Sequence, residues 1–160
     1  MKTQSWLRIY IIASILLSTN ILTFGQLEDS EKIANLIDSS NSMLKLSQYK
    51  FSRDYAEQIL KINEDNCAAY IQLGNIYAQY AKKHTFKSKF ERSVIYCLAI
   101  DMYEIAKQTN NECTEEAKEK IQIYSNYLIE NDAPYIKTKE GEEITIKDWI
   151  NRKTKFRYAK

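Results

Sequence analysis

Apolar residues recur at helical spacing along most of the chain, and the pattern is clearest between residues 67 and 111. Four of them occupy positions i, i+3, i+4 and i+7 of one helix face: Tyr70, Leu73, Gly74 and Tyr77. A glycine inside a helix costs about 1 kcal/mol relative to alanine, so its expected use is to let a second helix approach closely. A matching face follows at Ala99, Tyr103 and Ala106. The spacing predicts two antiparallel helices packed through Gly74.

Helical spacing also precedes and follows this pair. A first predicted helix begins near Glu31 and has the apolar stripe Ile33, Leu36, Ile37 and Leu44. A second has the stripe Phe51, Tyr55, Ile59 and Ile62. After the central pair, Thr114 opens another predicted helix, with the stripe Ala117, Ile121, Tyr124 and Leu128. We therefore expect about five helices over residues 31–130.

The period changes to two after Pro134. A turn is expected at residues 139–141, followed by alternating Ile144 and Ile146, and a second turn near Asn151 precedes alternating Thr154, Phe156 and Tyr158. The alternation predicts a small antiparallel β-hairpin over residues 135–158. Since an isolated hairpin is barely stable, we expect it to pack on the last helix. The predicted fold class is mainly α, with antiparallel helix hairpins and a small C-terminal β-hairpin.

The motifs Tyr-x2-Leu-Gly-x2-Tyr (residues 70–77) and Ala-x3-Tyr-x2-Ala (residues 99–106) resemble the two halves of a tetratricopeptide repeat. Several short motifs between residues 66 and 157, in order, more narrowly resemble short exported tetratricopeptide proteins of Bacteroidota. The resemblance implies a tetratricopeptide-like helical domain over residues 31–130 that serves as a scaffold for protein interaction without catalysis. The chain departs from the narrower pattern at Asp148, where cysteine is expected, and at Cys97, where tryptophan is expected. These departures leave any disulfide between the tail and the repeat in doubt.

The repeat contains an insertion. Gly74 and Ala99 are 25 positions apart, about 13 more than in an ordinary repeat of this family. The extra residues either lengthen both helices or form a protruding loop near residues 84–87. We expect longer helices, because Phe90, Val94 and Leu98 extend the second helix's apolar face backward at helical spacing.

The first 25 residues predict a secretory signal peptide. Lys2 and Arg8 flank the start of an apolar run over residues 9–17, and small residues follow before Gln26. We expect cleavage near Gly25, a disordered linker over residues 26–30, and export to the periplasm or cell surface. The alternative is a retained membrane anchor, and only then would the chain be bound to a membrane.

Composition supports a helical, core-forming protein, since aromatic residues make up 12% of a chain with only 3 glycines and 1 proline. The formal net charge of +2 falls to zero without Lys2 and Arg8. No strong global field therefore favours nucleic acid as a partner. Residues 82–92 and 152–160 are locally basic, which is typical of a solvated face and also suits an anionic envelope polymer.

The first helix of a tetratricopeptide repeat lines its concave face, so the resemblance implies a candidate protein-binding face of Ile71, Asn75, Ala78 and Gln79. Asn75 matches the asparagine of repeats that grip a peptide's terminal carboxylate. The lysine of that clamp would stand four residues earlier, where this chain has Ile71. We therefore expect no carboxylate clamp.

Two of the three cysteines stand at corresponding ends of the central pair. Cys67 opens its first helix and Cys113 follows the end of the second, so an antiparallel arrangement brings them close together. An oxidising compartment would allow a disulfide, and the residues alone leave open whether it forms. Cys97 lies inside an apolar helix, where a buried, unreactive thiol is expected.

Nothing in the sequence spells out a catalytic, metal or cofactor site. His84 is the only histidine and stands among lysines, and the acidic pairs 115–116 and 142–143 fall at a predicted helix start and hairpin. The interpretation is an exported, monomeric, non-enzymatic module for protein interaction or assembly in the cell envelope. The alternative is a structural subunit that binds peptidoglycan or another polysaccharide through its tyrosines.

Overall fold

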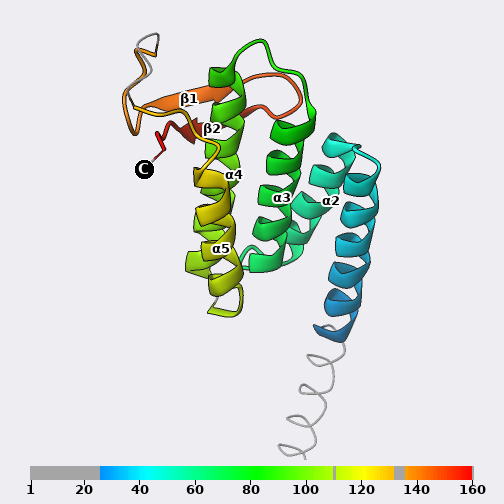
Figure 1. Cartoon of the computed structure of the whole chain (residues 1–160). Helices are drawn as coiled ribbons and strands as arrows, with labels where there is room; N and C mark the ends of the chain where they lie inside the picture. The colour runs from blue at the N-terminus through cyan, green and yellow to red at the C-terminus, as the bar shows by residue number, and fades with distance from the viewer. Residues whose placement is uncertain (1–25, 110, 132–135, 160) are drawn as a thin grey trace, which may run out of the picture. The chain divides into compact units, whose positions relative to one another are not determined.

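The computed structural model describes residues 26–109, 111–131 and 136–159. Residues 36–160 form one compact unit, and residues 26–35 belong to the unit before it. Across the described residues the chain is mainly helical, with five α-helices and a two-stranded antiparallel sheet near the C-terminus (Figure 1). The predicted fold class is confirmed. The predicted signal peptide, residues 1–25, lies outside the described residues.

The first helix covers residues 26–45 of the described chain. Residues 26–30 are therefore helical, and the expectation of a disordered linker there was wrong. The physical reason is local propensity, because the segment contains leucine, glutamate and glutamine and has no glycine or proline between residues 26 and 45.

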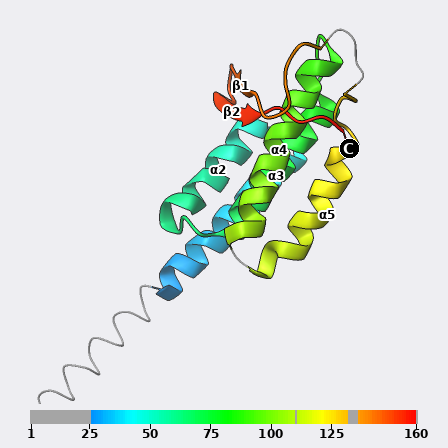
Figure 2. The same ribbon diagram turned by 90° about the vertical axis from the view of Figure 1, so that its left-hand side faces the viewer.

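Four further helices follow in antiparallel order. They are α2 (Tyr49–Ile62), α3 (Cys67–Lys83), α4 (Lys89–Thr109) and, after the short 3-10 turn η1 (Asn111–Cys113), α5 (Thr114–Ser125). Helix α3 lies between α2 and α4 (Figure 1), and α5 packs against α4 (Figure 2). The insertion lengthens α3 to 17 and α4 to 21 residues and leaves only residues 84–88 between them, as expected.

The core is the contact between α3 and α4. Most of the signature positions are fully buried there, namely Leu73, Tyr77, Ala99, Tyr103 and Ala106, whereas Tyr70 is only partly buried. The backbone of Gly74 faces the ring of Tyr103, and the space between them leaves no room for a Cβ atom. The close approach predicted at Gly74 is thus confirmed.

The buried face of α2 is rotated from the predicted stripe: Ile59 is buried as expected, but Phe51 is not. Phe51 is 57% exposed, and the buried residues are Ser52, Ala56 and Ile59. A polar contact explains the rotation: the Ser52 hydroxyl donates to the Ser40 carbonyl at 2.8 Å, and the Ser40 hydroxyl donates to the Ser52 carbonyl at 2.8 Å. Two buried serines satisfied in this way let the helix backbones approach closely.

The hairpin consists of β1 (Glu143–Ile146) and β2 (Arg152–Lys155), paired so that Ile144 faces Thr154. Its connection uses two residues with positive φ, Asp148 at 63° and Asn151 at 45°. Short polar side chains tolerate this left-handed conformation better than others, which suits the tight reversal.

The expectation that the hairpin packs on the last helix was wrong, because it packs mainly on α4 (Figures 1 and 2). Asp101 of α4 accepts a hydrogen bond from the Thr154 hydroxyl at 2.5 Å and pairs with Arg157 at 2.6 Å. The ring of Phe156 lies 5.3 Å from that of Phe90. An ion pair and aromatic packing thus direct the tail to α4. The tail also reaches the segment after α5, where the Ala159 amide donates a hydrogen bond to the Ile129 carbonyl at 2.9 Å.

Candidate binding cleft

The candidate binding face on α3 is largely buried. Ile71 and Ala78 are 6% and 1% exposed, and Gln79 is only partly exposed. Asn75 is also occupied, because its Oδ1 accepts a hydrogen bond from the Tyr103 hydroxyl at 2.9 Å. The physical reason is that α3 packs against both α2 and α4, so the predicted face is largely enclosed by the fold.

The structure instead forms a cleft of about 420 Å³ at the opposite end of α3 from Cys67. Its walls are the end of α3, the connection at residues 84–88, the start of α4, and β1 with the turn that follows it. The residues that line it are Tyr80, His84, Thr85, Phe86, Lys87, Phe90, Glu91, Val94, Ile95 and the segment 144–150. We call this the hairpin cleft.

Aromatic side chains build the floor of the hairpin cleft. Trp149 meets Tyr80 edge to face, with ring centroids 5.2 Å apart. His84 stacks on Tyr80 at 4.7 Å, and Phe86 meets the same ring edge to face at 5.5 Å. Such geometries stabilise aromatic pairs by about 0.5–1.5 kcal/mol beyond the area that they bury. Tyr80 is thus the centre of a cluster that joins the end of α3 to the hairpin.

Arg53 of α2 contacts Trp149 through both its ring and its main chain. Its guanidinium lies 5.5 Å from the centre of the indole and donates a hydrogen bond to the Trp149 carbonyl oxygen. Arg152 strengthens the same junction through an ion pair with Glu57 at 2.7 Å. The hairpin turn is therefore fixed to α2 as well as to α4, and this wall of the cleft is pre-formed.

The rim of the hairpin cleft is basic. Two cations line the cleft, Lys87 and Lys147, and four more stand on the same helix ends: Lys82, Lys83, Lys89 and Arg92. Among the described residues none of these six has an ion-pair partner, although seven ion pairs occur elsewhere. The acids at the cleft are Glu91, which accepts a hydrogen bond from the Lys87 amide at 3.0 Å, and Asp148. An excess of positive charge is left for an anionic partner.

Several buried groups in the core have raised pKa values, among them Tyr77, Cys97 and Tyr103. Burial raises the pKa of Tyr77 to about 12, against the opposing effect of nearby Arg152. Burial likewise raises the pKa of the Cys97 thiol to about 11, although the Arg157 amide donates a hydrogen bond to its sulfur at 3.3 Å. Cys97 is thus the buried, protonated thiol that the sequence predicts, and a protonated thiol is a poor nucleophile.

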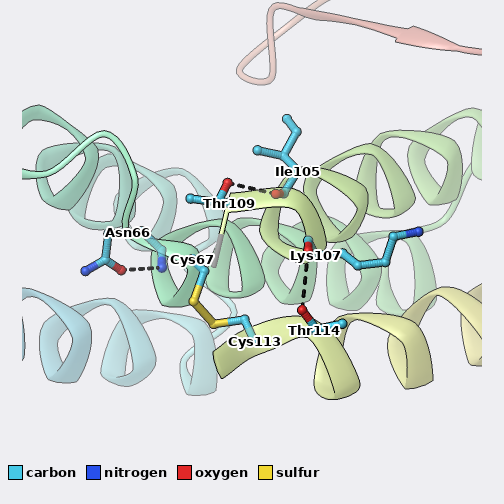
Figure 3. The surroundings of a disulfide bond; sticks show 8 residues. Asn66, Cys67, Ile105, Lys107, Thr109, Cys113 and Thr114 are labelled. Carbon is cyan, nitrogen blue, oxygen red and sulfur yellow. Dashed lines mark hydrogen bonds between the residues drawn. A yellow bond between two sulfur atoms is a disulfide. The ribbon is translucent and has the colours of Figure 1, made fainter. Parts of the chain in front are cut away.

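Cys67 and Cys113 form a disulfide, with their Cα atoms 6.0 Å apart (Figure 3). Cys67 is the first residue of α3 and Cys113 the last of η1, so the bond ties the start of α3 to the turn before α5. The side chain of Asn66 caps α3 at the same place by accepting a hydrogen bond from the Ala69 amide at 2.9 Å. The bond lies at the end of α3 away from the hairpin cleft.

In the described part of the chain, no cluster of three or more histidine, cysteine, aspartate or glutamate side chains could hold a metal ion. His84 is exposed and stacks on Tyr80. No helix formed by residues 26–109, 111–131 or 136–159 has the length and apolar character that crossing a membrane requires.

Sequence reasoning missed the hairpin cleft because its walls are far apart along the chain. Phe86 and Phe90 stand between the lysines of residues 82–92, and this mixture of rings and cations was the signal that marked one wall. Trp149 gave no comparable sign, since only the fold brings it to Tyr80. In comparisons with known proteins, no family model, no curated protein and no solved structure matches the chain.

Proposed function

We propose that the chain is an exported, non-catalytic interaction module of the cell envelope that binds a protein partner through the hairpin cleft. The observation that supports this most strongly is the cleft itself, which has an aromatic floor and a rim of cations without ion-pair partners among the described residues. A tetratricopeptide-like origin of the helices is part of the proposal, and the close packing at Gly74 supports it.

A pre-formed wall favours binding, because a surface that is already ordered loses little conformational entropy when a partner docks. Trp149 is held by Arg53 on one side and by Tyr80 on the other. Aromatic residues in such fixed settings are the side chains that dominate protein interfaces. Lys87 and Lys147, which stand exposed at the rim, would steer an acidic surface toward the floor.

Export is supported by the Cys67–Cys113 disulfide, since structural disulfides persist in oxidising compartments and are rare in the cytosol. The apolar run at residues 9–17 supports the same route.

Site-specific photocrosslinking in the native cell tests the proposal. A photoreactive amino acid is placed at Lys87 or Lys147 on the rim, and at Lys118 on α5 as an exposed lysine away from the cleft. We expect the two rim positions to capture the same protein and Lys118 not to capture it. Capture at all three positions alike, or at none, would contradict the proposal.

A second candidate is a polysaccharide-binding subunit, which the aromatic lining of the same cleft favours. Sugars stack on open ring faces, however, and the rings of Tyr80, Phe86 and Trp149 contact one another. Co-sedimentation of the purified chain with peptidoglycan, repeated with Trp149→Ala, distinguishes the two. Binding that depends on Trp149 and persists at high salt would favour the polysaccharide.

A further inference from the structure

The sheet has two strands among the described residues, and within that part of the chain each strand has one edge that no other strand pairs with. The Thr154 hydroxyl of β2 donates a hydrogen bond to Asp101 of α4, so β2 is the strand that is anchored to this helix. Strand β1 borders the hairpin cleft with three consecutive residues, Ile144, Thr145 and Ile146, and Lys147 continues this wall just after the strand. Side chains of a strand alternate between faces, so a cleft lined by consecutive residues runs along the edge of β1.

The hydrogen bond beside the start of the ladder shows which residues of β1 bond to β2 through their main chain. The Phe156 amide donates to the Glu142 carbonyl at 2.8 Å, and the register pairs Ile144 with Thr154. Hydrogen-bonded and non-hydrogen-bonded pairs alternate in an antiparallel ladder, so Ile144 and Ile146 bond to β2. The main-chain N–H and C=O of Thr145 then point away from β2. No backbone group elsewhere in the described residues bonds to them.

This unpaired edge lies beside an apolar wall and a basic rim. Phe90 and Val94 of α4 line the cleft and would accept the apolar side chains of an added strand. The side chains that alternate with these apolar ones along the added strand would lie near Lys87 and Lys147. Acidic side chains at those positions would form ion pairs with the two lysines.

We propose that the hairpin cleft binds an extended acidic segment of a protein partner, which adds to β1 as a third strand. The inference rests on the proposed function, since it specifies the partner that the same cleft binds. Main-chain hydrogen bonds to Thr145 supply affinity, and the alternation of apolar and acidic side chains supplies specificity. Strand β1 has 4 residues, so at about 3.3 Å per residue the contact spans about 13 Å and needs a segment of four to six residues or so.

A random dodecapeptide library displayed on phage, selected on the purified full chain, provides the probe. We expect selected peptides without proline in which acids alternate with apolar residues. A fluorescein-labelled synthetic copy of the best peptide is then titrated against wild type, Thr145→Pro and Thr145→Ala. Proline removes the outward N–H and alanine keeps it, so we expect the Kd to rise about tenfold or more with proline and to change less than about twofold with alanine.

Amide hydrogen exchange gives an independent measurement that needs no variant. On saturation of the wild-type chain with the same peptide, exchange of the Thr145 amide should slow about tenfold or more. If near-UV circular dichroism shows that Thr145→Pro does not fold, this measurement decides alone.

Three results would overturn the added strand: equal binding to Thr145→Pro and wild type, unchanged exchange at Thr145, or a library that yields no binder. The first two leave the proposed function standing if the rim positions still capture a protein in the cell. Failure of photocrosslinking at Lys87 and Lys147 would instead count against the proposed function itself.

Discussion

A Cβ atom on Gly74 would lie 2.6 Å from Cζ of Tyr103, well inside van der Waals contact. The ring cannot easily move away, because Tyr103 is fully buried and its hydroxyl donates to Asn75 on the same face of α3. This contact fixes how closely α3 and α4 approach each other. The C-terminal end of α3 and the N-terminal end of α4 form two walls of the hairpin cleft. The packing at Gly74 therefore also sets the geometry of the proposed binding surface.

We expect Gly74→Ala to destabilise the chain by about 1–3 kcal/mol. Alanine gains about 1 kcal/mol of helix propensity, but overpacking against Tyr103 costs more than this. The measurement is urea unfolding followed by circular dichroism. In a Tyr103→Leu background the ring is gone, so the same substitution should become nearly neutral or stabilising. An equal cost in both backgrounds would refute the contact as its cause.

The Cys67–Cys113 bond closes an interval of 46 residues. In the chain-entropy model such a loop contributes about 4 kcal/mol, so Cys67→Ser with Cys113→Ser should lower the free energy of unfolding by up to that amount. Thiol counting in denaturant without reductant should find one free thiol, that of Cys97. Three free thiols in the protein isolated from its own cell would show that the bond does not form there.

Alkaline pH should destabilise the chain. The pKa of Cys97 is raised from 9.0 to about 11 and that of Tyr77 from 10.0 to about 12. In the range between the lower and the higher value the unfolded chain loses the proton while the folded chain keeps it. The free energy of unfolding therefore falls as pH rises from about 9 to 11 for Cys97 and from about 10 to 12 for Tyr77.

Urea midpoints measured between pH 7.5 and 10.5 check this dependence. Because one pKa unit corresponds to about 1.4 kcal/mol, the fall should reach a few kcal/mol. Cys97→Ala removes the buried group whose unfolded pKa is lowest and should flatten the profile between about pH 9 and 10. An unchanged profile in that variant would mean that the thiol does not contribute.

Asp101 should anchor the hairpin. Asp101→Ala removes the acceptor of the Thr154 hydroxyl and the partner of Arg157, which should cost about 1–3 kcal/mol. Amide exchange in β2 should then speed up while exchange in the middle of α3 stays slow. Glu104→Ala, which breaks the pair with Lys107 on the same helix, serves as a control, and its cost should stay under about 1 kcal/mol.

The elements that sequence predicted correctly are those that a local pattern determines. The face of Leu73, Gly74 and Tyr77 has the 3.6-residue period, and the alternation of Ile144 and Ile146 has the period of two. The start of α2 was predicted with the wrong residue buried, for the opposite reason. Apolar spacing favoured Phe51, whereas the reciprocal bonds of Ser52 with Ser40 depend on a helix that precedes it. A small polar residue in a core contact leaves no apolar signal.

The candidate site was harder to predict because it depends on long-range packing. Asn75 and Gln79 were placed on an open concave face, which exists only where further repeats curve around it. Here Asn75 bonds to Tyr103, and the tail that completes the cleft lies on α4 through Arg157 and Asp101. Neither partner of that ion pair reveals its contact from sequence spacing.

The emission of Trp149 tests the hairpin cleft most directly. Trp6 lies in the expected signal peptide, so Trp149 is the single tryptophan both of the mature chain and of an uncleaved Trp6→Phe variant, and it reports on the floor of the cleft. The protein captured at Lys87 and Lys147 is titrated into this variant while its binding is followed separately by calorimetry. We predict a saturable change in Trp149 emission at the same stoichiometry, lost when Lys87 and Lys147 are both changed to glutamate. Binding that leaves Trp149 emission unaltered would contradict the account.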